Sequence, residues 1–212
     1  MARSAFIVIE GLDGSGKTVQ VDRLAAALRA EGRAVHTTTE PSEGPIGRFL
    51  RDALRPDGPS AGIGDAALAY LFAADRRDHL DREILPALAS GAVVLSDRYY
   101  HSSLAYQSLA LGLPMVATLN AGFRKPDATV FLGLSPEACL ARVMARGLAR
   151  ERFEALDRLR LVRDAYDQVL VHCRAEGETI LRVDASGPPE DVEARVRAAL
   201  APLLDAATVP AG

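Results

Sequence analysis

The stretch FIVIEGLDGSGKT, residues 6–18, decides the fold. Its first part, Phe6 to Ile9, is apolar at every position, as expected of a strand that is covered on both faces. Its second part, Gly11 to Thr18, fits the pattern G-x-x-x-x-G-K-[ST], in which backbone N–H groups wrap a phosphate. Val19 to Arg29 then repeats apolar residues at helical spacing. The loop therefore joins a strand to a helix, which is the context that this pattern requires.

Each residue type in the loop suits the binding of a nucleoside triphosphate. Glycines let the backbone turn inward, and the positive end of the following helix favours an anion. Lys17 is expected to reach the β and γ phosphates, and the Thr18 hydroxyl to bind Mg²⁺. Asp13 is a second anionic candidate near the metal. The predicted ATP-binding segment is Gly11, Leu12, Asp13, Gly14, Ser15, Gly16, Lys17 and Thr18.

Short runs rich in β-forming residues alternate with longer helical stretches over the whole chain. The predicted strands are 6–9, 34–38, 93–95, 129–132 and 179–183. The predicted helices are 19–29, 65–90 with Pro86 as a kink or an early end, 104–111, 114–122, 137–146, 156–174 and 189–204. This alternation predicts one three-layer α/β domain over residues 1–212, with a five-stranded parallel sheet and helices on both faces. Residues 205–212 are expected to form a loose tail.

The composition is that of an ordinary globular domain. Lys and Arg number 25 against 28 Asp and Glu, and this net charge of −3 argues against a nucleic-acid or membrane partner. No apolar run approaches the ~20 residues of a membrane span, and Ala5 to Ile9 is too short for a signal peptide. We expect a cytoplasmic protein in which Cys139 and Cys173 are reduced, buried and chemically inert.

Polar residues follow the predicted strands at the edge of the sheet where ligands bind. In a parallel α/β sheet that edge is formed by the carboxyl ends of the strands. Asp97 comes directly after the apolar run Val93 to Leu95, so it is the predicted metal carboxylate. The alternative is a helix cap on the segment that follows. Arg98 stands beside it, and a guanidinium there suits bidentate phosphate binding.

Two further groups of residues suggest a second phosphate. Phe72 and Arg76 are four residues apart on one helix, so they share a face that could hold a base and a phosphate. The alternative is a core Phe and a solvated Arg. Arg146, Arg150 and Arg152 surround a glycine just before a helix, which predicts a lid over about residues 146–155. The alternative there is a solvated basic turn.

With these residues assembled, the sequence resembles the thymidylate kinase family, which phosphorylates dTMP with ATP. The resemblance runs from Phe6 to about Ala185. It rests, in order, on FIVIEGLDGSGKT at 6–18, TEP at 39–41, LFAADR at 71–76, DRYYHSSLAYQ at 97–107, PD at 126–127 and the lid at 146–154. The segment at 97–107 is the most specific, since other nucleotide kinases lack it.

The resemblance implies a role for each matching position on the acceptor side. Phe72 would stack on thymine, and Arg76 would contact the base edge or the acceptor phosphate. Ser103 and Gln107 would border the base. Tyr106 would crowd the 2′ position and so favour deoxyribose.

It also implies roles around the phosphates. Arg98 would bind the dTMP phosphate, Asp13 would touch the 3′-hydroxyl and the metal region, and Glu40 would lie near the acceptor phosphate and Mg²⁺. Arg142 would flank the adenine of ATP. Because the phosphate loop has no basic residue between Gly11 and Gly16, the catalytic cation should come from the lid, as in the bacterial arrangement. Arg150 and Arg152 are the candidates, and Arg152 is preferred.

The sequence departs from the family pattern at three places. Thr39 replaces an Arg, Ser42-Glu43 replaces a glycine pair, and Gly133 stands where Asp is frequent. Thr39 removes a cation near the acceptor phosphate, so it bears on activity and on the choice of acceptor.

The resulting hypothesis is transfer of a phosphoryl group from ATP to dTMP with Mg²⁺, in dTTP synthesis. The catalytic residues would be Asp13, Lys17, Arg98 and Arg152. The resemblance also implies a homodimer, for which the apolar face of 104–111 could serve, although it could equally be core. Three alternatives remain: a kinase for another deoxypyrimidine monophosphate, a P-loop hydrolase or switch, and a non-catalytic nucleotide-binding module.

Overall fold

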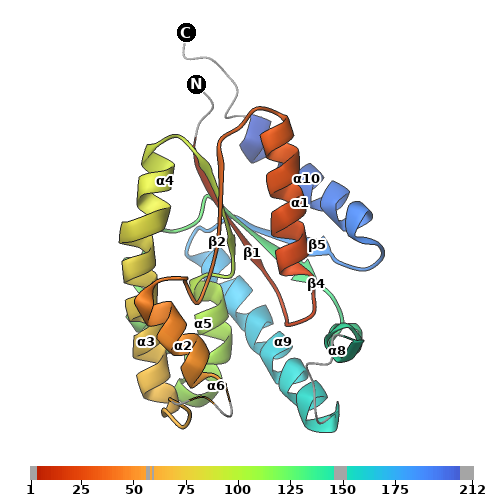
Figure 1. The fold of residues 1–212 in the computed structure, drawn as a ribbon. Helices are drawn as coiled ribbons and strands as arrows, with labels where there is room; N and C mark the ends of the chain where they lie inside the picture. Colours follow the sequence, from red (N-terminus) through yellow and green to blue (C-terminus); the bar gives the residue numbers. More distant parts are fainter. Residues whose placement is uncertain (1–3, 56–57, 59, 146–151, 206–212) are drawn as a thin grey trace.

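A five-stranded parallel sheet forms the centre of the molecule (Figure 1). The computed structural model of the chain describes residues 4–55, 58, 60–145 and 152–205, without the side chains of 152–154. The strands lie in the order β2-β3-β1-β4-β5, and all neighbouring pairs are parallel. Their bounds are β1 Ala5–Glu10, β2 Val35–Thr39, β3 Val93–Asp97, β4 Ala128–Gly133 and β5 Ile180–Asp184. The predicted fold class and all five predicted strands are confirmed, with ends that shift by one or two residues.

Helices cover both faces of the sheet. Their bounds are α1 Lys17–Ala30, α2 Pro45–Ala53, α3 Asp65–His79, α4 Leu85–Ala89, α5 Tyr100–Tyr106, α6 Ser108–Leu111, α7 Leu113–Asn120, α8 Pro136–Ala145, α9 Arg152–Ala175 and α10 Pro189–Asp205. On one face α1 and α10 pack together through residues such as Leu24 and Val196 (Figure 1). On the other face α5 and α9 pack through residues such as Leu104 and Val169. The sheet therefore has a buried apolar core on each side.

The predicted helix 65–90 continues past Pro86 by changing its winding. A π-helical turn, Leu80–Ile84, joins α3 to α4, and the Leu85 N–H donates to the Leu80 carbonyl. Pro86 then falls in the first turn of α4, where a missing N–H costs nothing. Of the two predicted effects of Pro86, an early end of the helix is excluded, because helical structure runs from 65 to 89.

Three helices differ from the sequence prediction. The helix α2, with Pro45 in its first turn, was not predicted. The helix α5 begins at Tyr100 rather than at Leu104, and α9 begins at Arg152 rather than at Leu156. Tyr, His and Ser are weak helix formers, so packing rather than propensity decides the start of α5.

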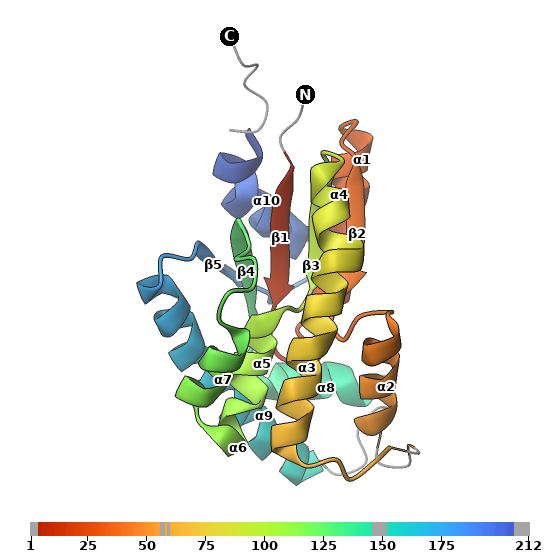
Figure 2. The ribbon, with the colours of Figure 1, turned by 90° about the vertical axis from the view of Figure 1, so that its left-hand side faces the viewer.

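The apolar face of 104–111 divides between core and surface. Leu104 and Ala105 are buried, whereas Leu109 is 45% exposed. The neighbouring helices α3 and α7 also expose large apolar side chains, Tyr70 and Met115. These helices lie side by side in Figure 2.

The strand register places the predicted site at one edge of the sheet. Ile9 on β1 and Thr39 on β2 both pair with Asp97 on β3. The loops after these three strands therefore begin next to one another, as the sequence predicted.

Candidate active site

The loop 11–16 is fixed by close contact with α8. Gly14 has φ +89°, and a Cβ there would lie 2.3 Å from the carbonyl oxygen of Cys139. Only glycine fits this position without moving the backbone of α8. Arg142, one turn further along α8, donates to the carbonyl oxygen of Ser15 at 3.3 Å and to that of Ala185 at 3.3 Å. The loop is thus held against α8 before any ligand binds.

Lys17 is held inside the loop by backbone carbonyls. Its Nζ donates to the carbonyl oxygens of Gly11 at 3.1 Å and Leu12 at 3.0 Å, and the residue is 7% exposed. Burial, together with the neighbouring cation Arg98, lowers the pKa of Lys17 to about 8. The ammonium group is therefore a partly desolvated cation, ready to exchange carbonyl contacts for a phosphate.

Thr18 and Asp97 meet across the gap between α1 and β3. The Thr18 Oγ1 donates to Asp97 Oδ2 at 2.5 Å. The other carboxylate oxygen, Oδ1, is buried and has no hydrogen-bond partner among the described residues. A hydroxyl beside an oxygen with an open lone pair is a donor set that a hard cation accepts. The alternative of Asp97 as a helix cap is not supported, because α5 begins without a side-chain cap.

A cavity of about 600 Å³ opens over the loop. Its lining includes the predicted ATP and metal residues 13–18, Asp97, Arg98 and Arg142. Thr39 also lines it, and its hydroxyl donates to the backbone carbonyl of Asp97 at 3.1 Å. Thr39, which stands where the family resemblance leads one to expect Arg, therefore brings no positive charge to the cavity. Its hydroxyl instead joins the end of β2 to the end of β3.

A second cavity, of about 390 Å³, lies beside the first. It brings together every predicted acceptor residue: Asp13, Glu40, Phe72, Arg76, Arg98, Ser103, Tyr106 and Gln107. Asp13, Glu40 and Arg98 line both cavities, so they form a shared wall. Residues that are up to 94 positions apart in the sequence, from 13 to 107, thus surround one space.

Arg98 is aimed between the cavities by an unusual backbone. Its φ of +75° is the only positive value among described non-glycine residues, and its carbonyl accepts from Ser96 Oγ at 2.7 Å. The guanidinium donates to Ser102 Oγ at 2.8 Å and pairs with Asp13. Strained φ values persist where the surrounding structure enforces them, and they concentrate at functional sites.

The charges of this pair support each other. Although burial opposes its charge, the pKa of Arg98 is raised well above its usual range by the hydroxyls of Tyr106 and Tyr166 and by Asp13. Burial also opposes the charge on Asp13, yet Arg98 and Lys17 lower its pKa. Tyr106 donates to Asp13 Oδ2 at 3.0 Å, and burial raises the pKa of Tyr106 to about 12. Within the shared wall, Arg98 and Asp13 therefore form a fixed cation–anion pair.

Sequence reasoning missed Glu10, which anchors the segment after β3. Glu10 is fully buried and accepts from the N–H of Tyr99 at 2.9 Å, the N–H and Oγ of Ser102 at 3.1 and 2.8 Å, and the hydroxyl of Tyr166 at 2.8 Å. Tyr166 also contacts Arg98 at 3.4 Å. A charged residue at the end of an apolar strand was the available signal, because a buried carboxylate must find donors.

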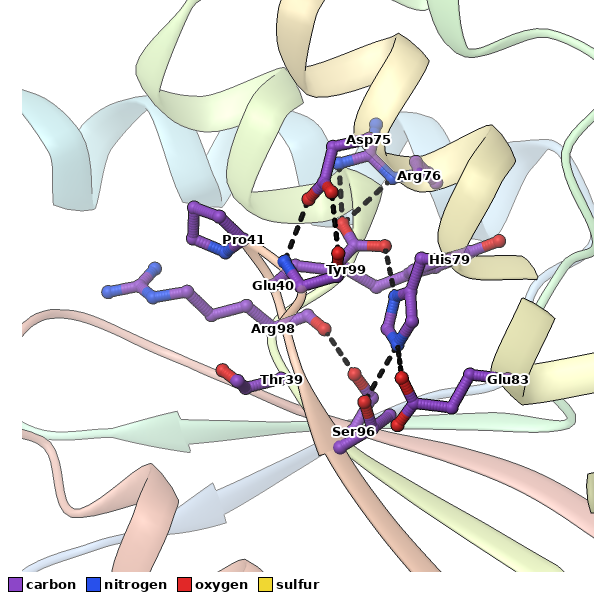
Figure 3. Close-up of polar contacts among 12 residues, drawn as sticks. Thr39, Glu40, Pro41, Asp75, Arg76, His79, Glu83, Ser96, Arg98 and Tyr99 are labelled. Carbon is purple, nitrogen blue, oxygen red and sulfur yellow. Dashed lines mark hydrogen bonds and ion pairs between the residues drawn. The ribbon is translucent and has the colours of Figure 1, made fainter. Parts of the chain in front are cut away.

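Arg76 is buried in the wall of the second cavity, with 1% exposure. Its Nε and Nη2 donate to Glu40 Oε2 at 3.0 and 2.8 Å (Figure 3). Nη2 also donates to Ser103 Oγ at 3.0 Å. A further bond reaches Asn120, and the guanidinium lies 5.4 Å from the ring centre of Tyr99. The alternative of a solvated Arg is therefore wrong. Glu40 therefore fixes the orientation of the Arg76 guanidinium through two hydrogen bonds.

The segment after Glu40 turns away through a cis peptide bond to Pro41. Ser42 then donates from its N–H and its hydroxyl to the two oxygens of Asp75, at 2.8 and 2.6 Å. Ser42 stands at a position where the family resemblance leads one to expect glycine, and here its hydroxyl binds α3. This contact places the end of β2 against the helix that carries Arg76.

The predicted lid lies mostly outside the described residues. Arg146 and Arg150 belong to the part that is not described, and Arg152 is the first residue of α9 without a described side chain. The lid and its catalytic arginine stay predictions.

Both cysteines are free and buried. Burial raises the pKa of the Cys139 thiol to about 11 and raises that of Cys173 further still. The prediction of inert thiols agrees with this. No helix in the described part of the chain is long and apolar enough to cross a membrane.

Comparison with known proteins gives one consistent result. The family model described as thymidylate kinase matches residues 9–196. A probable thymidylate kinase of Pyrobaculum aerophilum is 40% identical over 91% of this chain and 94% of its own length. Thymidylate kinases of Cereibacter sphaeroides and a Synechococcus species are 42% and 38% identical, over 98% and 96% of this chain and 99% and 97% of their own lengths.

Proposed function

The chain belongs to the thymidylate kinase family, and from this premise we propose how its residues divide the transfer of a phosphoryl group from ATP to dTMP. The chain is a dTMP kinase, an ATP-dependent nucleoside monophosphate kinase. The observation that carries the assignment of roles is the shared wall of Asp13, Glu40 and Arg98 between the two cavities. Two substrates on either side of this wall would face each other across one guanidinium.

The larger cavity is the proposed donor site. Backbone N–H groups of the loop and the ammonium of Lys17 would hold the phosphates of ATP, and Arg142 would flank its adenine. Thr18 and Asp97 would hold Mg²⁺, since the buried Oδ1 of Asp97 is free to bind it. When bound, the metal supplies charge neutralisation for the phosphate oxygens.

The smaller cavity is the proposed acceptor site. Phe72 would stack on thymine, Ser103 and Gln107 would border the base, and Arg76 would contact the base edge or the acceptor phosphate. Tyr106, tied to Asp13 at 3.0 Å, would leave no room for a 2′-hydroxyl. Glu40 would act by fixing Arg76, as its bonds at 3.0 and 2.8 Å indicate.

Catalysis in this proposal is alignment and charge neutralisation. The acceptor phosphate oxygen is already ionised, so no covalent enzyme intermediate is needed. Arg98 and Lys17 would draw the two anionic substrates together, and a lid arginine, preferably Arg152, would neutralise the transferring group. Closure of the lid would exclude the water that otherwise hydrolyses ATP.

A coupled assay of ADP release over a panel of nucleoside monophosphates tests the proposal. We expect the highest kcat/KM with dTMP, and a loss of about 10²–10³ in kcat for Lys17→Met and Arg98→Ala. Full turnover by either variant at saturating substrate would contradict these two roles. A higher kcat/KM for another deoxypyrimidine monophosphate would assign that nucleotide as the acceptor in place of dTMP. ADP release without any acceptor would indicate a hydrolase, and ATP binding without transfer a non-catalytic module.

We also propose that the enzyme works as a homodimer in the cytoplasm. The exposed apolar residues Tyr70, Leu109 and Met115, on three neighbouring helices, support an interface on this face. Sedimentation of the wild-type protein and of Leu109→Asp tests it: a dimer that becomes a monomer is expected. A monomeric wild-type protein would refute it.

A further inference from the structure

His79 is a fully buried histidine that contacts Glu40, which lines the proposed acceptor cavity (Figure 3). It is the last residue of α3 and lies between Glu40 and Glu83. We propose that His79 is a positioning residue, which holds Glu40 and through it Arg76 in the geometry that binds dTMP. This inference rests on the proposed acceptor role of Arg76.

Both ring nitrogens of His79 face hydrogen-bonding partners. Nδ1 lies 3.3 Å from Glu40 Oε1, while Nε2 lies 2.7 Å from Thr38 Oγ1 and 3.5 Å from Glu83 Oε2. Because the Glu40 carboxylate is paired with Arg76 and can only accept, Nδ1 must carry a proton. The Thr38 hydroxyl is also within hydrogen-bonding reach of Glu83, so it either donates to that carboxylate and accepts from a charged ring, or donates to a neutral ring. The ring is therefore anchored on β2 and presents an N–H to Glu40.

Glu40 depends on this N–H because its two oxygens serve different partners. Oε2 accepts both bonds from Arg76, and Oε1 is contacted by His79. Glu40 is 4% exposed, so water does not replace a lost donor easily. If His79 were absent, rotation of the carboxylate would break one of the two bonds that orient the guanidinium. The effect would reach the acceptor site without any contact between His79 and the substrate.

The chain contains a matched histidine that lacks this connection. His101 is also fully buried, lies 2.9 Å from a carboxylate oxygen of Glu178, and has a threonine, Thr129, at 3.4 Å. Neither His101 nor Glu178 lines either cavity. Substitution of either histidine can thus remove a buried histidine–carboxylate contact. Only the carboxylate partner of His79, Glu40, also binds Arg76.

Two substitutions separate the two ends of the His79 ring. In His79→Asn the amide nitrogen of the shorter side chain would take the place of Nδ1, so this variant keeps a donor toward Glu40 and loses Thr38. The longer amide in His79→Gln reaches the Nε2 position instead, so it keeps a partner for Thr38 and loses Glu40. A positioning role predicts that only the second variant disturbs dTMP binding.

The experiment is steady-state kinetics of the full chain with dTMP and ATP varied separately. We expect His79→Gln to raise the KM for dTMP about tenfold, as expected for one lost hydrogen bond to a charged group, and to leave the KM for ATP within about twofold. His79→Asn should stay within about threefold for both substrates. His101→Asn, whose shorter amide does not reach the Nε2 position and so loses Glu178, should keep the dTMP KM even if its urea midpoint falls as far as that of His79→Gln.

The inference would be overturned if His79→Asn raised the KM for dTMP as much as His79→Gln, or more. It would also be overturned if the KM for dTMP rose in proportion to the loss of stability in all variants. Arg76→Ala is measured in parallel. If it leaves the KM for dTMP unchanged, the proposed acceptor role itself fails; if it raises that KM while His79→Gln does not, only the positioning role fails. Nitrogen NMR of the wild-type protein needs no variant: a ring protonated at Nε2 alone would refute the proposed contact.

Discussion

Lys17 is a residue whose environment makes a prediction about pH. Its pKa of about 8, below the ordinary 10.5, means that the free enzyme loses this cation as the pH rises through 8. We expect kcat/KM for ATP to fall about tenfold per pH unit above that value, in a pH–rate profile measured from 6 to 10. In Lys17→Arg, which stays charged, the alkaline decrease should disappear whatever the absolute rate. A flat profile in the wild-type enzyme would contradict the prediction.

The same shift has a consequence for stability that has the opposite sign. Between pH 8 and 10.5 the unfolded chain keeps a proton on Lys17 that the folded protein has released. The contribution of Lys17 to the free energy of unfolding therefore rises across this window. Below pH 8 both states are protonated, and the cost of burying the charge is constant. Urea titrations of the wild type and of Lys17→Met at pH 7.5 and 10 would show the difference.

At the residue scale the sequence predicted more than half of the residues that line the larger cavity and half of those that line the smaller one. Short motifs with fixed chemistry, such as the loop 11–18 and the pair Asp97-Arg98, carry their own spacing and need no knowledge of the fold. Glu10, His79 and Tyr166 were missed because each acts through another residue. The partners are distant in the sequence, by 39 positions for His79 and Glu40 and by 156 for Tyr166 and Glu10. Only the packing of the fold brings such pairs together.

At the scale of elements, α9 is linked through Tyr166 to Arg98 in the wall of the smaller cavity. Tyr166, in its middle, donates to Glu10 and contacts Arg98. Tyr166→Phe leaves Glu10 with its other three bonds, so we expect a loss of about 1 kcal/mol in the free energy of unfolding and a several-fold lower kcat/KM for dTMP. Urea unfolding and steady-state kinetics measure the two effects. Val171→Ala, on the same helix and 64% exposed, is the control and should change neither beyond about 0.5 kcal/mol or twofold. If Tyr166→Phe has no effect on either quantity, the link is refuted.

The helix α1 carries one side of the core. Leu24 is fully buried between α1 and the sheet, so Leu24→Ala should lower the free energy of unfolding by about 2–5 kcal/mol. Leu161 on α9 is 58% exposed, and Leu161→Ala should stay within about 0.5 kcal/mol. Urea unfolding at pH 7 compares the two. A small effect at Leu24 would mean that the core relaxes to fill the space.

Element types were easier to predict from the sequence than element limits. Apolar runs identified β1, β3 and β4, because buried parallel strands need apolar side chains on both faces. The edge strands β2 and β5 are only partly buried and include polar residues, so the alternation of strands and helices identified them instead. The short helix α2 was missed, since its nine residues begin with a Pro and include a Gly, the two weakest helix formers. The π-helical turn before Pro86 was equally hidden, because no residue pattern distinguishes it from an ordinary helical turn.

For the whole molecule, the two cysteines provide a probe of opening. Both are buried in the same apolar cluster as Tyr166 and Leu170, and burial raises the pKa of both thiols. We expect neither to react with a thiol reagent in the native protein at pH 7.5, and both to react in urea. Labelling followed by absorbance measures this. Rapid labelling of one thiol without denaturant would show that the cluster opens locally.

The wall shared by the two cavities also limits how this enzyme can evolve. Asp13, Glu40 and Arg98 line both cavities, so under the proposed function a mutation at any of them should affect the binding of both substrates together. Phe72, Ser103 and Gln107 line only the smaller space. Lineages that acquire a new nucleobase should therefore diverge first at these three positions, while the wall between the pockets is inherited intact.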